Sequence, residues 1–211
     1  MDRIQTRGEE WANSISHGIG FLGSIAVTPL LILSAIPYGP AFITGVSIFG
    51  FTMMVLYLAS TLYHALRGGK AKRIFLTFDH AAIFLLVAGT YTPFTLGTLY
   101  GAWGWSLFGL VWGMALFGIL LKILWMGRLK RISTGLYLGM GWLAVIAVKP
   151  LWINLPFWGI FWLVMGGVLY SAGVLFFRAE KLPYHHLIWH LFVLAGTACH
   201  VVAVMAYSFP D

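Results

Sequence analysis

Seven long apolar stretches dominate the 211-residue sequence, and each is long enough to cross a lipid bilayer as an α-helix. A helix needs about 20 predominantly apolar residues to span the hydrocarbon core. Only 9% of the chain is charged and 60% is hydrophobic, which excludes a soluble domain. The sequence predicts an all-α integral membrane protein, with residues 1–211 forming a single seven-transmembrane helix bundle. The expected spans are about residues 14–36, 41–65, 74–98, 103–125, 132–149, 156–178 and 185–208.

The breaks between the stretches are short and rich in turn-forming residues, as in IPYGPA, TLYGAWG and KPLWINLP. Loops of this length make consecutive helices antiparallel neighbours. The N-terminal segment MDRIQTRGEEWANSISH is polar and acidic, unlike the basic start of a signal peptide, so the first helix is expected to be retained.

The basic residues predict the direction of the bundle. Every Lys and Arg except Lys149 lies before the first stretch or near the loops that follow the second, fourth and sixth stretches. Cytoplasmic loops hold the excess of basic residues, so we expect a cytoplasmic N-terminus and a C-terminus outside. The net charge of +7 is then a topology signal, and no nucleic-acid partner is predicted.

Four ionisable residues fall at one depth in this arrangement. His64 ends the second helix, Asp79 lies one to two turns into the third, and His186 and His190 begin the seventh. The i, i+4 spacing places His186 and His190 on one helix face, where both can bind one ion. With a single cysteine, Cys199, the chain has no Cys-rich metal site, so a metal must be held by His and carboxylate.

A zinc ion (Zn²⁺) suits this set. His64, His186 and His190 would supply three ligands and leave a fourth position for water, as in catalytic zinc sites. Asp79 would deprotonate that water or serve as a fourth ligand, and is the candidate catalytic carboxylate. Solvated or packed histidines without metal are the alternative, and iron, copper or nickel also accept imidazole.

Further polar residues surround this level. Ser60 lies four residues before His64 on the same helix face, as a catalytic nucleophile, a ligand-orienting group or a packing hydroxyl. Glu10, Asn13 and His17 align on the first helix, either capping it or supporting the metal ligands from a second shell. His80 and His185 are expected to be interface histidines, and His200 a hydrogen-bonded core histidine. Pro93 is expected to kink the third helix and to free carbonyls that Thr90 or Tyr91 could satisfy.

Four segments together resemble the hemolysin III family, the bacterial branch of the progestin and adiponectin receptor superfamily. They are EEWANSISH, STLYHA, FDHAAIFLLVAGTYTPF and HLIWHLFVLAGTACH. The resemblance covers nearly the whole chain, from about Glu10 to the end of the last stretch.

The resemblance implies a seven-helix bundle in the bacterial cell (inner) membrane with its N-terminus inside. In the receptor branch, the histidines matching His64, His186 and His190 bind zinc, and the aspartate matching Asp79 reaches the ion through water. That branch and the similar alkaline ceramidases are linked to lipid amide hydrolysis. The bacterial branch is named for haemolysis and tied to membrane homeostasis.

Two functions stay open from the sequence. One is a zinc-dependent hydrolase in which a membrane lipid is the substrate and His17 or Ser60 helps to position the oxyanion. The other is a non-enzymatic membrane-homeostasis or membrane-perturbing (haemolytic) protein with structural zinc. A pore or transporter is disfavoured, because the half of the bundle away from the histidines is almost wholly apolar.

Overall fold

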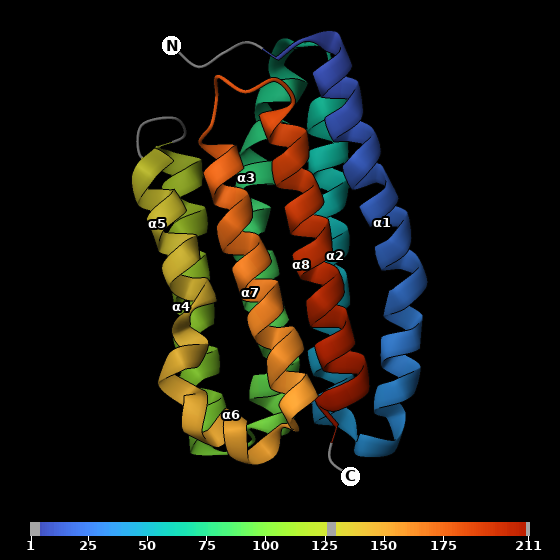
Figure 1. Ribbon diagram of the computed structural model, residues 1–211, viewed down its shortest axis with the longest axis vertical. Coiled ribbons are helices and arrows are strands. Elements are labelled where there is room, and N and C mark those ends of the chain that lie inside the picture. The colour runs from blue at the N-terminus through green and yellow to red at the C-terminus, as the bar shows by residue number, and fades with distance from the viewer. Residues whose placement is uncertain (1–4, 126–129, 210–211) are drawn as a thin grey trace.

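The computed structural model describes residues 5–125 and 130–209, which are helical throughout apart from short connections (Figure 1). Seven helical segments in this part of the chain are long and apolar enough to cross a membrane, as the sequence predicts. The start of α1 and the end of α8 lie at opposite ends of the bundle. The helices are α1 (Arg7–Ala35), α2 (Pro40–Ala65), α3 (Gly69–Pro93), α4 (Ala102–Leu124), α5 (Lys130–Gly141), α6 (Val148–Asn154), α7 (Phe157–Phe177) and α8 (His185–Tyr207). Three shorter turns are η1 (Ile36–Tyr38), η2 (Phe94–Thr98) and η3 (Leu143–Ala147).

Helices α2, α3 and α8 form the centre of the bundle. At least half of the most apolar window in each of these spans is buried inside the protein, against 17–28% in the other spans. The backbones of α2 and α3 approach closely at Gly45, where a Cβ atom would lie 2.8 Å from Cα of Pro93. The exposed Leu, Ile, Phe and Trp side chains of the outer helices suit contact with lipid. Two of these central helices carry His64, His186 and His190, the predicted metal ligands.

Helix α1 begins earlier than the predicted residue 14, because a capping box starts it at Arg7. The Glu9 amide donates to Thr6 Oγ1 at 3.3 Å, and the Thr6 amide donates to Glu9 Oε2 at 2.8 Å. The expectation that Asn13 caps this helix was therefore wrong. The two additional turns place Glu10, Asn13 and His17 within one continuous helix.

The fifth span is broken, although the sequence predicted one helix over 132–149. Helix α5 ends at Gly141, the 3-10 turn η3 follows, and α6 continues to Asn154, through part of the expected loop KPLWINLP. Pro150 is tolerated because it lies in the first turn of α6, where its missing N–H is not needed.

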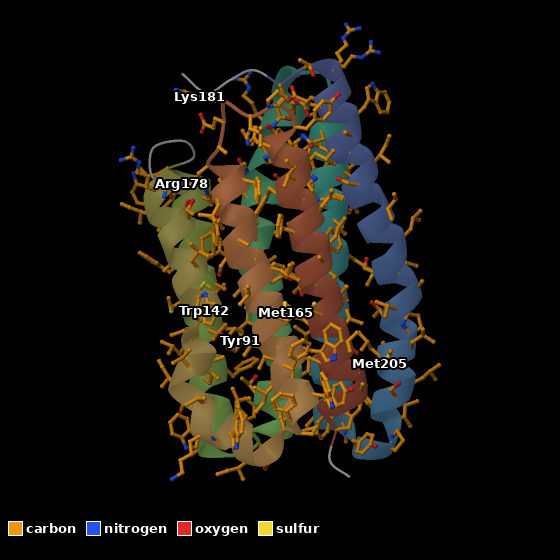
Figure 2. All side chains as sticks on the ribbon, viewed as in Figure 1. Tyr91, Trp142, Met165, Arg178, Lys181 and Met205 are labelled. Carbon is orange, nitrogen blue, oxygen red and sulfur yellow. The ribbon has the colours of Figure 1, made fainter. Side chains whose placement is uncertain are left out.

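The hydroxyl group of Tyr91, a residue of α3 labelled in Figure 2, forms hydrogen bonds with the backbone at this break. This hydroxyl lies 2.8 Å from the Gly141 carbonyl and accepts the Ala144 amide at 2.9 Å. The prediction that Tyr91 serves carbonyls freed in its own helix was wrong. Thr90 donates to the Leu86 carbonyl within α3, which continues past Pro93 as the π-helical turn η2. π-Helix is rare in proteins and occurs mostly as single turns of this kind.

Candidate metal centre

Three histidines from two helices meet near the end of the bundle where α1 begins. His64 lies in the last turn of α2, and His186 and His190 lie in the first two turns of α8. One ring nitrogen from each lies within 4.8 Å of the others, which is close enough for a metal ion to bind all three. His64 and His190 are buried, and the His186 side chain is partly buried. The structure thus brings together the three residues that the sequence predicted as ligands.

Residues of α1 orient two of the three imidazole rings through hydrogen bonds. Nδ1 of His64 lies 2.7 Å from Glu10 Oε2, and Nδ1 of His190 lies 3.2 Å from the Asn13 carbonyl oxygen. A carboxylate and a carbonyl only accept, so each Nδ1 carries the proton and each Nε2 keeps its lone pair. Nε2 of His64 and of His186 is buried without a hydrogen-bond partner. Metal-binding histidines are typically held in this way, so the donor set fits a divalent ion that accepts imidazole.

The predicted supporting residues on α1 all contact the cluster, but in different ways. Glu10 binds His64 and also accepts a hydrogen bond from Lys72 Nζ at 2.8 Å. Asn13 reaches His190 through its backbone carbonyl, and its side-chain amide donates to Gln5 Oε1 at 2.7 Å. The His17 ring stacks on the His190 ring with centroids 3.5 Å apart and planes 6° apart.

Two contacts to this cluster were not predicted from the sequence. Ser16 Oγ lies 3.1 Å from His190 Nδ1, and Lys72 binds the carboxylate that holds His64. Ser16 lies three residues after Asn13, so its place on the polar face of α1 was a signal that helical spacing could have given. Lys72 was interpreted only as a topology residue of the loop LRGGKAKR. In the structure Lys72 lies in the first turn of α3, so its contact with Glu10 depends on where the connection after α2 places that turn.

Asp79 and Ser60 occupy different positions around the cluster. Asp79 is buried and lines the same cavity as His186 and His190, with Oδ2 3.7 Å from Nδ1 of its neighbour His80. Ser60 is fully buried, and its Oγ has no hydrogen-bond partner. Ser60 is not among the residues that line the cavity.

The other histidines have separate roles. His80 Nδ1 donates to the Leu76 carbonyl at 2.9 Å. His185 was expected at the interface, but it is buried and donates from Nδ1 to the Phe176 carbonyl of α7 at 3.2 Å. That expectation was wrong, because the connection before α8 folds the ring against α7. His200 is a hydrogen-bonded core histidine, as predicted.

A mainly apolar cavity of about 180 Å³ leads from the histidine cluster into the bundle. One water molecule needs only ~15 Å³ measured in this way, so the cavity is large. Most of its wall is formed by α3, the broken fifth span, α7 and α8, with single side chains from α1, α2 and α4, and it reaches from His186 and His190 to His200. Between the fifth span and α7, Trp142 Nε1 donates to Ser171 Oγ at 3.0 Å. Two of the three candidate ligands, His186 and His190, therefore line the same mainly apolar cavity as His200.

Fold and site together define a seven-helix integral membrane protein with a buried three-histidine cluster. The family model described as "Haemolysin-III related" matches residues 5–201, and the chain belongs to this family. The seven apolar spans, together with membership of this bacterial family, identify it as a multi-pass protein of the bacterial inner membrane.

Individual relatives support this assignment. The chain is 46% identical to Hemolysin-3 of Bacillus cereus, over 96% of this chain and 93% of that protein. It is 49% identical to a Hemolysin-3 homolog of Bacillus subtilis (strain 168), over 94% of each chain. The human monocyte to macrophage differentiation factor is 29% identical over 77% of this chain and 69% of its own length, in keeping with the progestin and adiponectin receptor superfamily. No solved structure matched the chain.

Proposed function

We propose that this protein is a zinc-dependent hydrolase that cleaves lipid amides inside the membrane. One observation carries the proposal: one ring nitrogen from each of three histidines lies within 4.8 Å of the others, and two of these histidines, His186 and His190, line a mainly apolar cavity. Structural zinc sites are usually closed by four protein ligands, whereas three ligands leave a position for chemistry. Asp79 on the cavity wall is the candidate for proton transfer.

The zinc ion would be held by His64, His186 and His190. The contacts of Glu10 and Asn13 with Nδ1 of His64 and His190 support this choice, because they leave Nε2 of both rings free to bind. Zinc bound there would polarise a carbonyl group and lower the pKa of a water ligand to ~7.

The protein's own side chains would supply the remaining steps. The Asp79 carboxylate would accept a proton from the attacking water and return it to the leaving nitrogen. Ser60 Oγ and the His17 ring nitrogens are buried without hydrogen-bond partners. One of these groups would donate to the oxygen that becomes negative as water adds to the carbonyl. Ser60 would do so only after a rearrangement, since it does not line the cavity.

The substrate class follows from the walls of the cavity. Leu, Ile, Val, Phe and Trp side chains from six of the seven spans line it, and an acyl chain fits such walls. The amide bond would lie at the histidine end, and the chain would extend toward His200. A membrane lipid is therefore the expected partner.

The test is zinc content and fatty acid release in purified protein. We expect about one zinc per chain and release of fatty acid from a lipid amide such as ceramide. Asp79→Asn should keep the zinc and lose at least about 100-fold in rate, the usual scale of general base catalysis. Glu180→Gln, which changes an exposed carboxylate, is the matched control. A zinc-free active protein, or full activity in Asp79→Asn, would contradict the proposal.

A second candidate is a non-enzymatic membrane protein whose zinc is structural. The histidines join α2 to α8, and α1 contacts both, so an ion there would hold the first, second and last spans together. The two bacterial relatives carry the name hemolysin, which suits a membrane-perturbing role for this chain too. An unchanged haemolytic or membrane phenotype in Asp79→Asn, with unfolding of His190→Ala, would favour this function.

A further inference from the structure

A second group of polar side chains lies on the cavity wall far from the histidine cluster. His200 follows His190 by ten residues on α8, and a helix rises ~1.5 Å per residue, which separates them by about 15 Å. Tyr170 of α7 packs edge-on against His200, with ring centroids 5.2 Å apart. Both side chains line the cavity.

The hydrogen bonds of this pair define what it can still bind. His200 Nε2 lies 3.2 Å from the Leu163 carbonyl oxygen, so Nε2 carries the proton. Nδ1 of the neutral ring is then an acceptor, and it is buried without a partner. Thr197 donates to the Val193 carbonyl, so the Tyr170 hydroxyl must donate to Thr197 Oγ1, 2.8 Å away. The Tyr170 oxygen therefore also has acceptor capacity left.

The two acceptors, His200 Nδ1 and the Tyr170 hydroxyl oxygen, determine which kind of ligand group can bind between the apolar side chains of the cavity wall. A carboxylate or phosphate would be repelled, since it brings only further acceptors. A cation would lack a counter-charge: among residues 5–125 and 130–209, no acidic side chain lines this end of the cavity. A neutral hydroxyl group satisfies the His200 lone pair without introducing a charge, and unsatisfied buried acceptors are rare in folded proteins.

We propose that His200 and Tyr170 form a subsite for a hydroxyl group carried on the acyl chain of the bound lipid. This inference rests on the proposed function in one respect: it takes the polar end of the lipid to lie at the histidine cluster. With C–C bonds of ~1.5 Å, an extended chain advances about 1.25 Å per carbon, so about 15 Å corresponds to about 12 carbons. The subsite would give the protein a preference for hydroxylated chains of about this length.

The experiment measures equilibrium binding to purified, zinc-loaded protein in detergent by calorimetry, without turnover. The probes are dodecanoate, ω-hydroxydodecanoate and α-hydroxydodecanoate. We expect the ω-hydroxy ligand to bind about five- to tenfold more tightly than dodecanoate, the scale of one net hydrogen bond. The α-hydroxy ligand should show no such gain, because its hydroxyl lies at the other end of the cavity.

The variant His200→Phe should abolish the preference and bind dodecanoate as wild type does. His185→Phe is the matched control, because His185 also donates to an α7 carbonyl but does not line the cavity. Tyr170→Phe should weaken the preference, and it decides the question if His200→Phe fails to fold.

Several results would overturn the subsite: equal binding of dodecanoate and its ω-hydroxy form, no binding of either, or an undiminished preference in the variants. Fatty acid release from lipid amides with equal binding would remove the subsite and leave the hydrolase standing. A preference that depends on His200, in a protein without hydrolase activity, would keep the subsite and reject the hydrolase.

Discussion

Glu10 shows how a single side chain on the first helix can control a site on two others. Its carboxylate bridges His64 Nδ1 and Lys72 Nζ, at 2.7 and 2.8 Å. A negative partner on Nδ1 makes the opposite nitrogen a stronger metal ligand. The charge of Glu10 should therefore matter for metal affinity more than for the fold.

We predict that Glu10→Gln weakens zinc binding about 10- to 100-fold, the usual effect of losing such a partner. Competition with a chelating dye on the purified protein measures this change. Glu180→Gln should bind zinc as the unmodified protein does. An unchanged zinc affinity in Glu10→Gln would show that the carboxylate does not support the ligand.

The site residues differ in how far the sequence could reveal them. His186 and His190 follow from helical spacing, and His64 and Asp79 follow from their depth in the predicted spans. The role of the Asn13 carbonyl could not be predicted, since every residue has a backbone oxygen and the residue type does not show which one forms a contact. The contact of Lys72 with the site was not predicted, because its partner Glu10 is 62 residues away in the chain.

At the level of elements, the broken fifth span depends on one hydroxyl from α3. Tyr91 bonds to carbonyls before η3 and to an amide inside it. Hydropathy identified this span correctly, but it could not distinguish a straight helix from one with a 3-10 turn, because both bury similar apolar residues. The element that stabilises the turn comes from about 50 residues earlier in the chain.

We predict that Tyr91→Phe destabilises the protein by ~1–3 kcal/mol, because it leaves partly buried backbone groups without this partner. Thermal unfolding in detergent provides the measurement. Tyr100→Phe is the control, since Tyr100 is 77% exposed. Equal melting temperatures for the two variants would mean that water replaces the Tyr91 hydroxyl.

At the scale of the whole molecule, metal binding should stabilise the bundle as well as the site. The three histidines come from α2 and α8, and their ligand geometry exists only when both helices are packed. Binding to the folded state alone stabilises it by ~2.7 kcal/mol when free zinc exceeds the Kd 100-fold. Chelation should therefore lower the melting temperature of the wild type. The variant His186→Ala should not respond, and an equal response in it would place the zinc elsewhere.

The direction of the bundle in the membrane stays a prediction from the basic residues. We expect a reporter fused after Asp211 to be outside and one placed in the loop after α2 to be cytoplasmic. Protease accessibility in intact cells and in inverted vesicles distinguishes these positions. The opposite pattern would move the histidine cluster to the outer face and would contradict the charge rule used here.

Contacts between the first and last helices also bear on biosynthesis. His190 is oriented by the Asn13 carbonyl and the Ser16 hydroxyl, which are separated from it by 177 and 174 residues. While the ribosome is still translating, α1 has already reached the bilayer and α8 does not yet exist. The histidine cluster is therefore completed at the end of synthesis, and a chain that stalls early has no means of assembling it.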